Sequence, residues 1–120
     1  MIEVTEVSIA ELRAALESGR TSAVELVKAY LARIDAYDGP DSDTHLNAVV
    51  VRNPDALKEA EASDARRARG QTLSPLDGIP YTAKDSYLVK GLTAASGSPA
   101  FKDLVAQHDA FTIERLRAAQ

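Results

Sequence analysis

The sequence predicts an α/β fold that is mostly helical and has two short strands. Two capping boxes each precede a stripe of apolar residues at helical spacing, which is typical of helices that pack on a core. Two short apolar runs, at about 46–51 and 79–84, suit strands. Glycine or proline stands between several of these segments and separates them into distinct elements.

The first two helices are expected at about 8–18 and 22–37. Their capping boxes are Ser8 with Glu11 and Ser22 with Glu25, and their stops are Gly19 and Gly39-Pro40. The apolar stripes are Ile9, Leu12 and Leu16 in the first helix, and Val24, Val27, Leu31 and Ile34, widened by Leu26 and Tyr30, in the second. We expect a helical hairpin packed on a larger body. A membrane face or a partner helix would give a similar pattern.

Two further helices are expected at about 54–69 and 109–120. Asn53 is placed to cap the first of them, with Pro54 at its first helical position, and Asp109 to cap the second. The last turn of the 54–69 helix is basic, with Arg66, Arg67 and Arg69. These charges complement the helix dipole, and at a net charge of −4 this interpretation is preferred to a phosphate-binding patch.

Composition excludes several function classes. Hydrophobic residues make up 45% and charged residues 27% of the 120 residues, as in ordinary globular chains, and the negative net charge argues against binding nucleic acid or an anionic membrane. The chain has no cysteine, and its two histidines, His45 and His108, are too far apart in sequence to suggest a metal site. We expect no cofactor, no signal peptide and no membrane span, and hence a cytoplasmic protein.

The stretch from Pro75 to Phe101 carries the chemistry-bearing residues. Its first part ends on Lys84-Asp85-Ser86, and after a glycine the chain enters a loop of small residues at 93–98. Such loops let backbone N–H groups approach a ligand closely. A lysine at a strand end beside such a loop can serve as an amine base, but most lysines are solvated surface charges, and the pattern also fits an exposed Lys84–Asp85 pair.

Several ordered motifs in this chain resemble the amidase signature family. The strings LDGIPYTAKDS (76–86) and KGLTAASGSPAF (90–101) resemble the segment around that family's catalytic lysine. Further matches are HLNAVV (45–50), ARRARG (65–70) and DAFTIERLR (109–117), so the resemblance extends over nearly the whole chain. It implies that residues 1–120 form the amino-terminal segment of a single amidase domain, with a mixed sheet flanked by helices.

The resemblance implies hydrolysis of small-molecule carboxamides by a Ser–Ser–Lys triad through an acyl-enzyme. Lys84 matches the triad lysine, and Asp85 and Ser98 match supporting positions, Asp85 as an orienting hydrogen-bond acceptor and Ser98 in the small-residue loop. A lysine base must be neutral, so burial would have to lower its pKa from about 10.4. The family's two serines and its oxyanion loop lie downstream, and no GGSSGG-like string is present here, so the 120 residues alone should be inactive.

Three positions depart from the family pattern and bear on the substrate subgroup. Ser86 stands where asparagine is commoner, Ala94-Ala95 where two threonines are commoner, and Thr93 where proline is usual. The sequence does not identify the amide substrate. It does not fix the oligomeric state either, and a homo-oligomer is one possibility.

Two hypotheses of different class follow. In the first, the chain is the amino-terminal part of an amidase. In the second, it is a free-standing, non-catalytic α/β interaction module derived from that fold. A Schiff-base lysine enzyme would need an anion site and an electrophile partner, which the sequence does not offer. The reading frame beyond codon 120 discriminates the first two.

Overall fold

The computed structural model describes residues 2–120 and begins with two capped helices, α1 (Ile9–Glu17) and α2 (Ala23–Tyr37). Both capping boxes are formed. Ser8 Oγ accepts a hydrogen bond from the Glu11 backbone N–H (3.2 Å), and the Glu11 carboxylate accepts one from the Ser8 N–H (2.8 Å). Ser22 and Glu25 repeat this arrangement at the start of α2. The boxes satisfy backbone donors that the first turn of a helix leaves free.

The apolar stripes of α1 and α2 bury their side chains in two small clusters. The first cluster comprises Val4, Leu12, Leu16, Leu26 and Ile79. The second lies between α2 and α3 (Ala56–Ala68) and comprises Ala23, Val27 and Ala60. Small side chains in this second cluster let the two helices approach closely. Ile9, at the start of the α1 stripe, remains 60% exposed, so the stripe is narrower than the spacing suggests.

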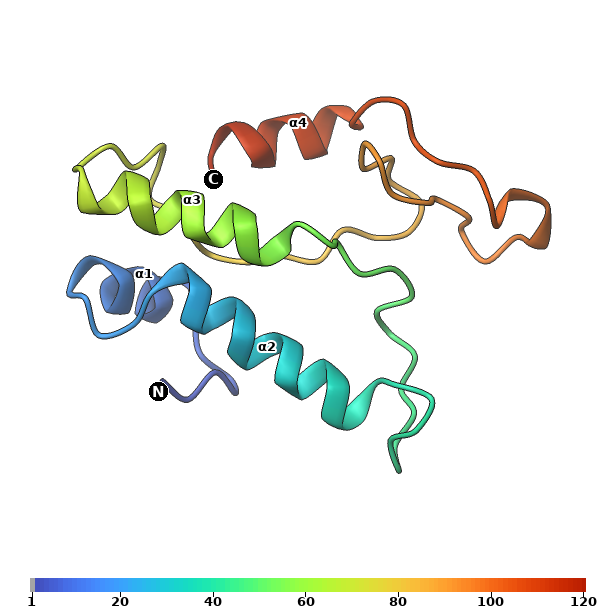
Figure 1. Cartoon of the computed structure of the whole chain (residues 1–120), viewed down its shortest axis with the longest axis horizontal. Helices are drawn as coiled ribbons and strands as arrows, with labels where there is room; N and C mark the ends of the chain where they lie inside the picture. The colour runs from blue at the N-terminus through green and yellow to red at the C-terminus, as the bar shows by residue number, and fades with distance from the viewer. Residues whose placement is uncertain (1) are drawn as a thin grey trace.

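The helices form a flat arrangement with α3 at its centre. Figure 1 shows α2 and α3 side by side and running in opposite directions, with α4 (Phe111–Ala118) along the other side of α3. The shortest dimension is 21 Å, about two helix diameters. The longest helix, α2, has 15 residues, and within the described part of the chain no helix is long and apolar enough to cross a bilayer.

The expected strand at 46–51 is not formed, because its backbone binds Asp38 instead. The Asp38 carboxylate accepts hydrogen bonds from the N–H groups of Ala48 (2.5 Å) and Val49 (3.0 Å). Asn47 has a φ of 51°, in the left-handed region that a strand cannot contain. The apolar residues of this run reflect exposed irregular chain rather than a buried strand.

The expected strand at 79–84 is also irregular chain. A strand needs a hydrogen-bonded neighbour, and within residues 2–120 the pairing amounts to one isolated antiparallel bridge, between Thr93 and Val105. Ile79 is buried, whereas the residues from Tyr81 to Lys84 are exposed. Tertiary context decides strand formation, and these residues have no partner strand here.

Asn53 and Asp109, the expected side-chain caps of the two later helices, form other hydrogen bonds. Asn53 Oδ1 accepts from the Asp55 N–H (3.0 Å), which places a turn before α3, and the helix begins at Ala56 without a side-chain cap. Asp109 Oδ1 accepts from the Lys90 N–H (2.7 Å), and α4 begins after Ala110. In each case a nearby loop donor competes successfully for the capping oxygen.

Candidate functional site

The segment that leads to Lys84 starts at a fully buried carboxylate, Asp77. Its side chain is 0% exposed. Oδ1 accepts hydrogen bonds from Ser63 Oγ (2.7 Å) and Arg66 Nη2 (2.7 Å), and Oδ2 accepts from Arg66 Nε (3.0 Å) and the Leu73 N–H (2.9 Å). The arginine therefore binds the carboxylate in two-point fashion, the strongest geometry for such a pair. All of these donors come from α3 or from the turn that follows it.

Asp77 and Arg66 remain ionised at neutral pH. Burial by itself would raise the pKa of Asp77, but the hydrogen bonds from Arg66 and Ser63 outweigh it and lower that pKa from 3.8 to about 2. The same hydrogen bond raises the pKa of Arg66 above its ordinary value. The sequence suggested only that Arg66 complements the α3 dipole. The sequence shows an Asp-Gly turn after an arginine-rich helix end, and this pattern does not by itself indicate a buried pair.

Gly78 brings the turn against the helices. Its φ is +90°, and a Cβ there would lie 2.8 Å from Ser63 Oγ and 3.1 Å from Ala23 Cβ. A side chain at this position would therefore meet both α3 and the start of α2. Glycine is required twice, for the left-handed backbone and for the close approach.

The carboxyl-terminal end of the chain holds the same segment from another side. Gln120 Nε2 donates a hydrogen bond to the Ile79 carbonyl (2.7 Å), and Ser74 Oγ donates to the Ala119 carbonyl (2.5 Å). The Arg67 side chain also donates to the Asp77 carbonyl (2.5 Å). In Figure 1 the chain reverses after α3 and passes behind that helix. Residues 77–79 are thereby fixed between α3 and the end of α4.

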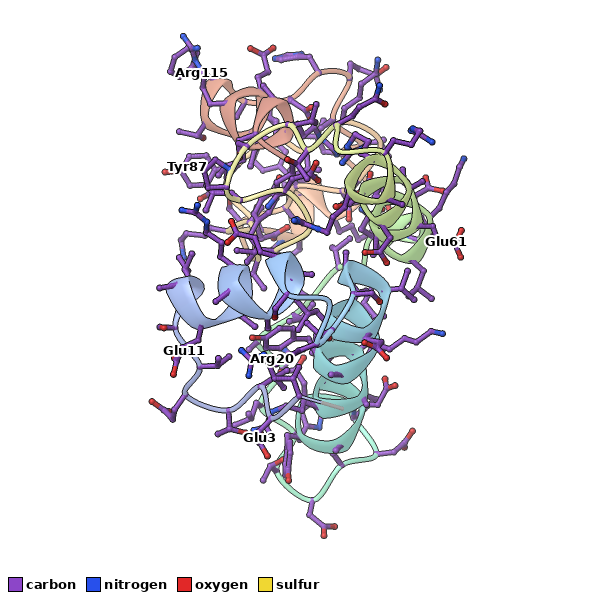
Figure 2. The ribbon with its side chains drawn as sticks, turned by 90° about the vertical axis from the view of Figure 1, so that its left-hand side faces the viewer. Glu3, Glu11, Arg20, Glu61, Tyr87 and Arg115 are labelled. Atoms are coloured by element: carbon purple, nitrogen blue, oxygen red, sulfur yellow. The ribbon has the colours of Figure 1, made fainter. Side chains whose placement is uncertain are left out.

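Lys84 lies beyond this fixed point on exposed chain. Its carbonyl accepts a hydrogen bond from the Tyr87 N–H (2.8 Å), which closes a turn. Tyr87 projects at the edge of the molecule in Figure 2. Within residues 2–120 the Lys84 side chain forms no ion pair, so the exposed Lys84–Asp85 pair considered from sequence is not made. The amine is accessible for contact with other groups.

Ser98 lies at the end of the small-residue loop and is half-buried. Its N–H donates to the Ala95 carbonyl (2.8 Å), and its own carbonyl accepts from Phe101 at the end of η1 (Pro99–Phe101). Ser96 and Gly97 both have positive φ values, 50° and 74°. In the described part of the chain no hydrogen bond or ion pair joins Lys84, Asp85 and Ser98. The three expected site residues thus share one segment but no direct contact.

A second charged cluster surrounds Arg117 of α4, which the sequence did not predict. Arg117 Nη1 donates to Glu59 Oε1 (3.2 Å), and Arg117 Nε lies 2.9 Å from Asp109 Oδ2. Burial alone would lower the pKa of Arg117, but these two carboxylates produce a net rise. Partial burial also raises the pKa of Tyr81, which lies near this cluster and is 38% exposed. The cluster joins α4 to α3 close to the segment that carries Lys84.

Within residues 2–120 no three His, Cys, Asp or Glu side chains gather as metal ligands. A shallow hollow lies on α1 and is lined by Ile9, Ala10, Arg13, Ala14, Glu17, Pro75 and Leu76. None of the expected site residues lines it, so this hollow is separate from Lys84.

Comparison with known proteins identifies relatives over nearly the whole chain. The sequence model of the family described as Amidase matches residues 25–120. A glutamyl-tRNA(Gln) amidotransferase subunit from Thermobifida fusca is 42% identical over 120 residues, which cover 99% of this chain and 23% of that protein. The corresponding subunit from Thioalkalivibrio sulfidiphilus is also 42% identical, over 94% of this chain and 22% of its own length.

Solved structures agree with the sequence relatives. The native peptide amidase from Stenotrophomonas maltophilia superposes with a TM-score of 0.90 at 37% identity, over 96% of this chain and 23% of that chain. An amidase family protein from Bacillus anthracis superposes with a TM-score of 0.87 at 32% identity, over 97% and 23% respectively. The chain therefore spans about a quarter of the length of the relatives it matches.

Proposed function

Because this chain belongs to the amidase family and has the fold of that family's amino-terminal segment, we propose that it contributes Lys84 to a Ser–Ser–Lys amidase. The proposed reaction is hydrolysis of a small-molecule carboxamide. The observation that carries the proposal is the position of Lys84 in the string IPYTAKDS, on exposed chain five residues after the firmly held turn at 77–79. We place the protein in the cytoplasm on its composition.

In the proposed reaction the lysine acts through a bridging serine. The neutral amine accepts the proton of that serine, which accepts the proton of the nucleophilic serine as its oxygen attacks the amide carbon. The C–N bond then breaks, the proton passes to the departing amine, and water hydrolyses the acyl-enzyme. Lys84 is the proposed base, Asp85 orients hydrogen bonds beside it, and Ser98 supports the small-residue loop.

Both serines and the oxyanion donors must come from outside these 120 residues. Ser86, Ser96 and Ser98 are not proposed as nucleophiles, because they do not match the family's serine positions. The proposed site also requires that the lysine be covered by further protein, since closure around the reacting groups excludes water. The open position of Lys84 is therefore compatible with a site that is completed by additional chain.

A second candidate function is supported by the exposed apolar side chains. Leu46, Val50, Phe101, Leu104, Val105 and Phe111 are all more than two-fifths exposed. A free-standing interaction module would present such a surface to a partner. The reading frame beyond codon 120 separates the two: a G-K-x-N string and a Gly/Ser-rich loop support the amidase, and a stop codon supports the module.

The test is to replace Lys84 in the complete protein. Lys84→Ala should lower amide hydrolysis by orders of magnitude while the circular dichroism spectrum stays unchanged, because the side chain makes no ion pair within residues 2–120. Lys102→Ala, another exposed lysine of the same half of the chain, is the matched control and should keep full activity. Near-normal turnover by Lys84→Ala would show that this lysine is not the base.

A further inference from the structure

We propose that Asp77 is a positioning residue that fixes where the segment bearing Lys84 leaves the helical layer. The consequence for catalysis rests on the proposed function of Lys84, whereas the consequence for structure does not. Asp77 is the most completely bonded carboxylate in the described residues, and it precedes Lys84 in the same continuous segment. Its place in this segment, and not only its burial, is what suggests a positioning role.

The bonds to Asp77 restrain both the side chain and the backbone of the turn. Four hydrogen bonds reach its carboxylate from Ser63, Arg66 and the Leu73 N–H, and one reaches its carbonyl from Arg67. Loss of one partner from a buried charged network is costly, because the other charge is left unsatisfied. The network therefore has one stable arrangement, with residue 77 held in one place.

The next two residues extend this restraint toward Lys84. Gly78 can sit against Ser63 and Ala23 only without a side chain, and the Ile79 carbonyl accepts the hydrogen bond from Gln120. The Ile79 side chain is buried in the first apolar cluster. Residues 77–79 are thus fixed at backbone and side chain alike.

A short stretch of chain connects Lys84 to the fixed residues 77–79. The lysine follows Ile79 by five positions, so the distance between their Cα atoms cannot exceed about 18 Å even in a fully extended chain. Within residues 2–120 no backbone hydrogen bond from another element reaches residues 80–84. Beyond Lys84 the chain is held again where Ala110 donates to the Leu88 carbonyl and Asp109 accepts from Lys90. The two anchored ends of this segment therefore limit where the lysine can lie, and Asp77 holds the first of them.

The control is Asp64, a second carboxylate of the same region with a different task. Asp64 accepts hydrogen bonds from the N–H groups of Ala23 (2.7 Å) and Val24 (3.1 Å) at the start of α2. Replacing it should loosen α2 and leave residues 77–84 in place. Asp77→Asn and Asp64→Asn make the same chemical change, and the two carboxylates are distinguished by which backbone amides exchange faster in each variant.

The first measurement is backbone amide hydrogen exchange of the complete protein. Asp77→Asn should speed exchange at Leu73 and Ile79 by about tenfold or more, since a lost charged hydrogen bond is worth about 1.5–3 kcal/mol. Asp64→Asn should speed exchange at Ala23 and Val24 instead. Equal acceleration at Ile79 in both variants, or none in Asp77→Asn, would overturn the inference.

The second measurement is steady-state kinetics of the complete protein, well below the melting temperature of each variant. Asp77→Asn should lower kcat about tenfold or more with KM within about twofold, because misplacing a catalytic group by about 1 Å can cost about 100-fold in rate. Asp64→Asn should keep kcat. An inactive Lys84→Ala together with an unchanged kcat in Asp77→Asn would overturn the inference but not the proposed function.

Activity in Lys84→Ala would instead refute the proposed function, and the exchange measurement would then decide the structural statement alone. If Asp77→Asn does not fold, Ser63→Ala takes its place, because it removes one donor and leaves the Arg66–Asp77 pair intact. Ser63→Ala should also speed exchange at Leu73 and Ile79 and lower kcat, each by less than Asp77→Asn. Unchanged exchange at Ile79 and unchanged kcat in Ser63→Ala would count against the inference.

Discussion

The carboxylate of Asp64 lies 2.7 Å from the backbone nitrogen of Ala23 and so caps α2 from the neighbouring helix α3. Its other oxygen accepts from the Val24 N–H at 3.1 Å. Together with Ser22 and Glu25, this contact satisfies the donors of the first turn of α2. The start of α2 is thereby fixed to α3, against which Gly78 also packs.

Asp64→Ala should lower the free energy of unfolding by about 1 kcal/mol, the usual effect of losing a capping oxygen. The measurement is the urea midpoint of the helical circular dichroism signal. Asp43→Ala, a charge change on the exposed loop after α2, is the control and should shift the midpoint little. Equal shifts in the two variants would show that the contact contributes nothing beyond charge.

Gly78→Ala should be among the most destabilising single-methyl changes in the chain. The new Cβ would combine a left-handed backbone, which costs about 1–2 kcal/mol, with overpacking against Ser63 and Ala23, which costs about 1–3 kcal/mol. Gly91→Ala is the matched control, since Gly91 has a φ of +84° and open space around its Cβ position. In denaturant unfolding, the free energy of unfolding of Gly78→Ala should be clearly lower than that of Gly91→Ala. The reverse order would mean that the turn can move away from α3.

The stability of the chain should fall on acidification from about pH 4 to about pH 2. The pKa of Asp77 is lowered from 3.8 to about 2 in the folded state, so the unfolded chain takes up this proton first. The contribution is complete above about pH 4 and is lost as the pH falls through about 2, with a magnitude on the order of 2 kcal/mol.

This pH dependence is measured as the difference between the original chain and Asp77→Asn in urea unfolding at each pH. Asp43→Asn controls for the other carboxylates that titrate in the same range. The destabilisation by Asp77→Asn should shrink between about pH 4 and about pH 2, because protonation removes the same charge. A difference that stays constant across this range would show that Asp77 does not titrate as the ion pair with Arg66 implies.

Local signals in the sequence predicted the helices better than the connections between them. The capping boxes at Ser8 and Ser22 use donors and acceptors within three residues, so spacing alone identifies them. The strands at 46–51 and 79–84 depend on neighbours that residues 2–120 do not supply. Hydrophobicity and β-branching cannot decide that question.

The sequence did not predict the polar contacts between residues that are far apart in the chain. Asp109 has the sequence position of a cap, yet a loop amide from Lys90 takes its oxygen. Asp77 reads as an ordinary turn residue, and only the reversal of the chain behind α3 brings it to Ser63 and Arg66. The sequence motif identified Lys84 as the candidate base, and its role as a base remains a prediction.

The 120-residue chain should expose enough apolar surface to bind hydrophobic dyes or to associate. Phe111 is 68% exposed and Phe101 54%, and Leu104 and Val105 lie exposed close to Phe101 in sequence. Large exposed apolar patches are rare on monomeric proteins and favour association. Phe101→Ser with Phe111→Ser should reduce dye fluorescence and association without loss of helicity. A tight monomer with cooperative unfolding and no dye binding would contradict the expectation.

These 120 residues alone should hydrolyse no amide. Attack on a resonance-stabilised carboxamide requires a nucleophile, a base and donors for the developing oxyanion, held together. The chain offers Lys84, but it has no cysteine, and none of its serines matches the family's nucleophile position. Loss of a single oxyanion donor costs about 3 kcal/mol in a serine protease, and here the whole donor loop is outside the sequence.

The exposure of Lys84 adds to this deficit, because nothing within these residues encloses the amine together with a nucleophile. The deficits act together, so no partial activity is expected. The test incubates the purified chain with simple aliphatic and aryl amides and assays released ammonia or amine against a buffer blank. Turnover above the blank that disappears in Lys84→Ala would mean that the nucleophile lies within these residues. Ser86, Ser96 and Ser98 would then be the candidates to replace one at a time, because each lies in the stretch that follows Lys84.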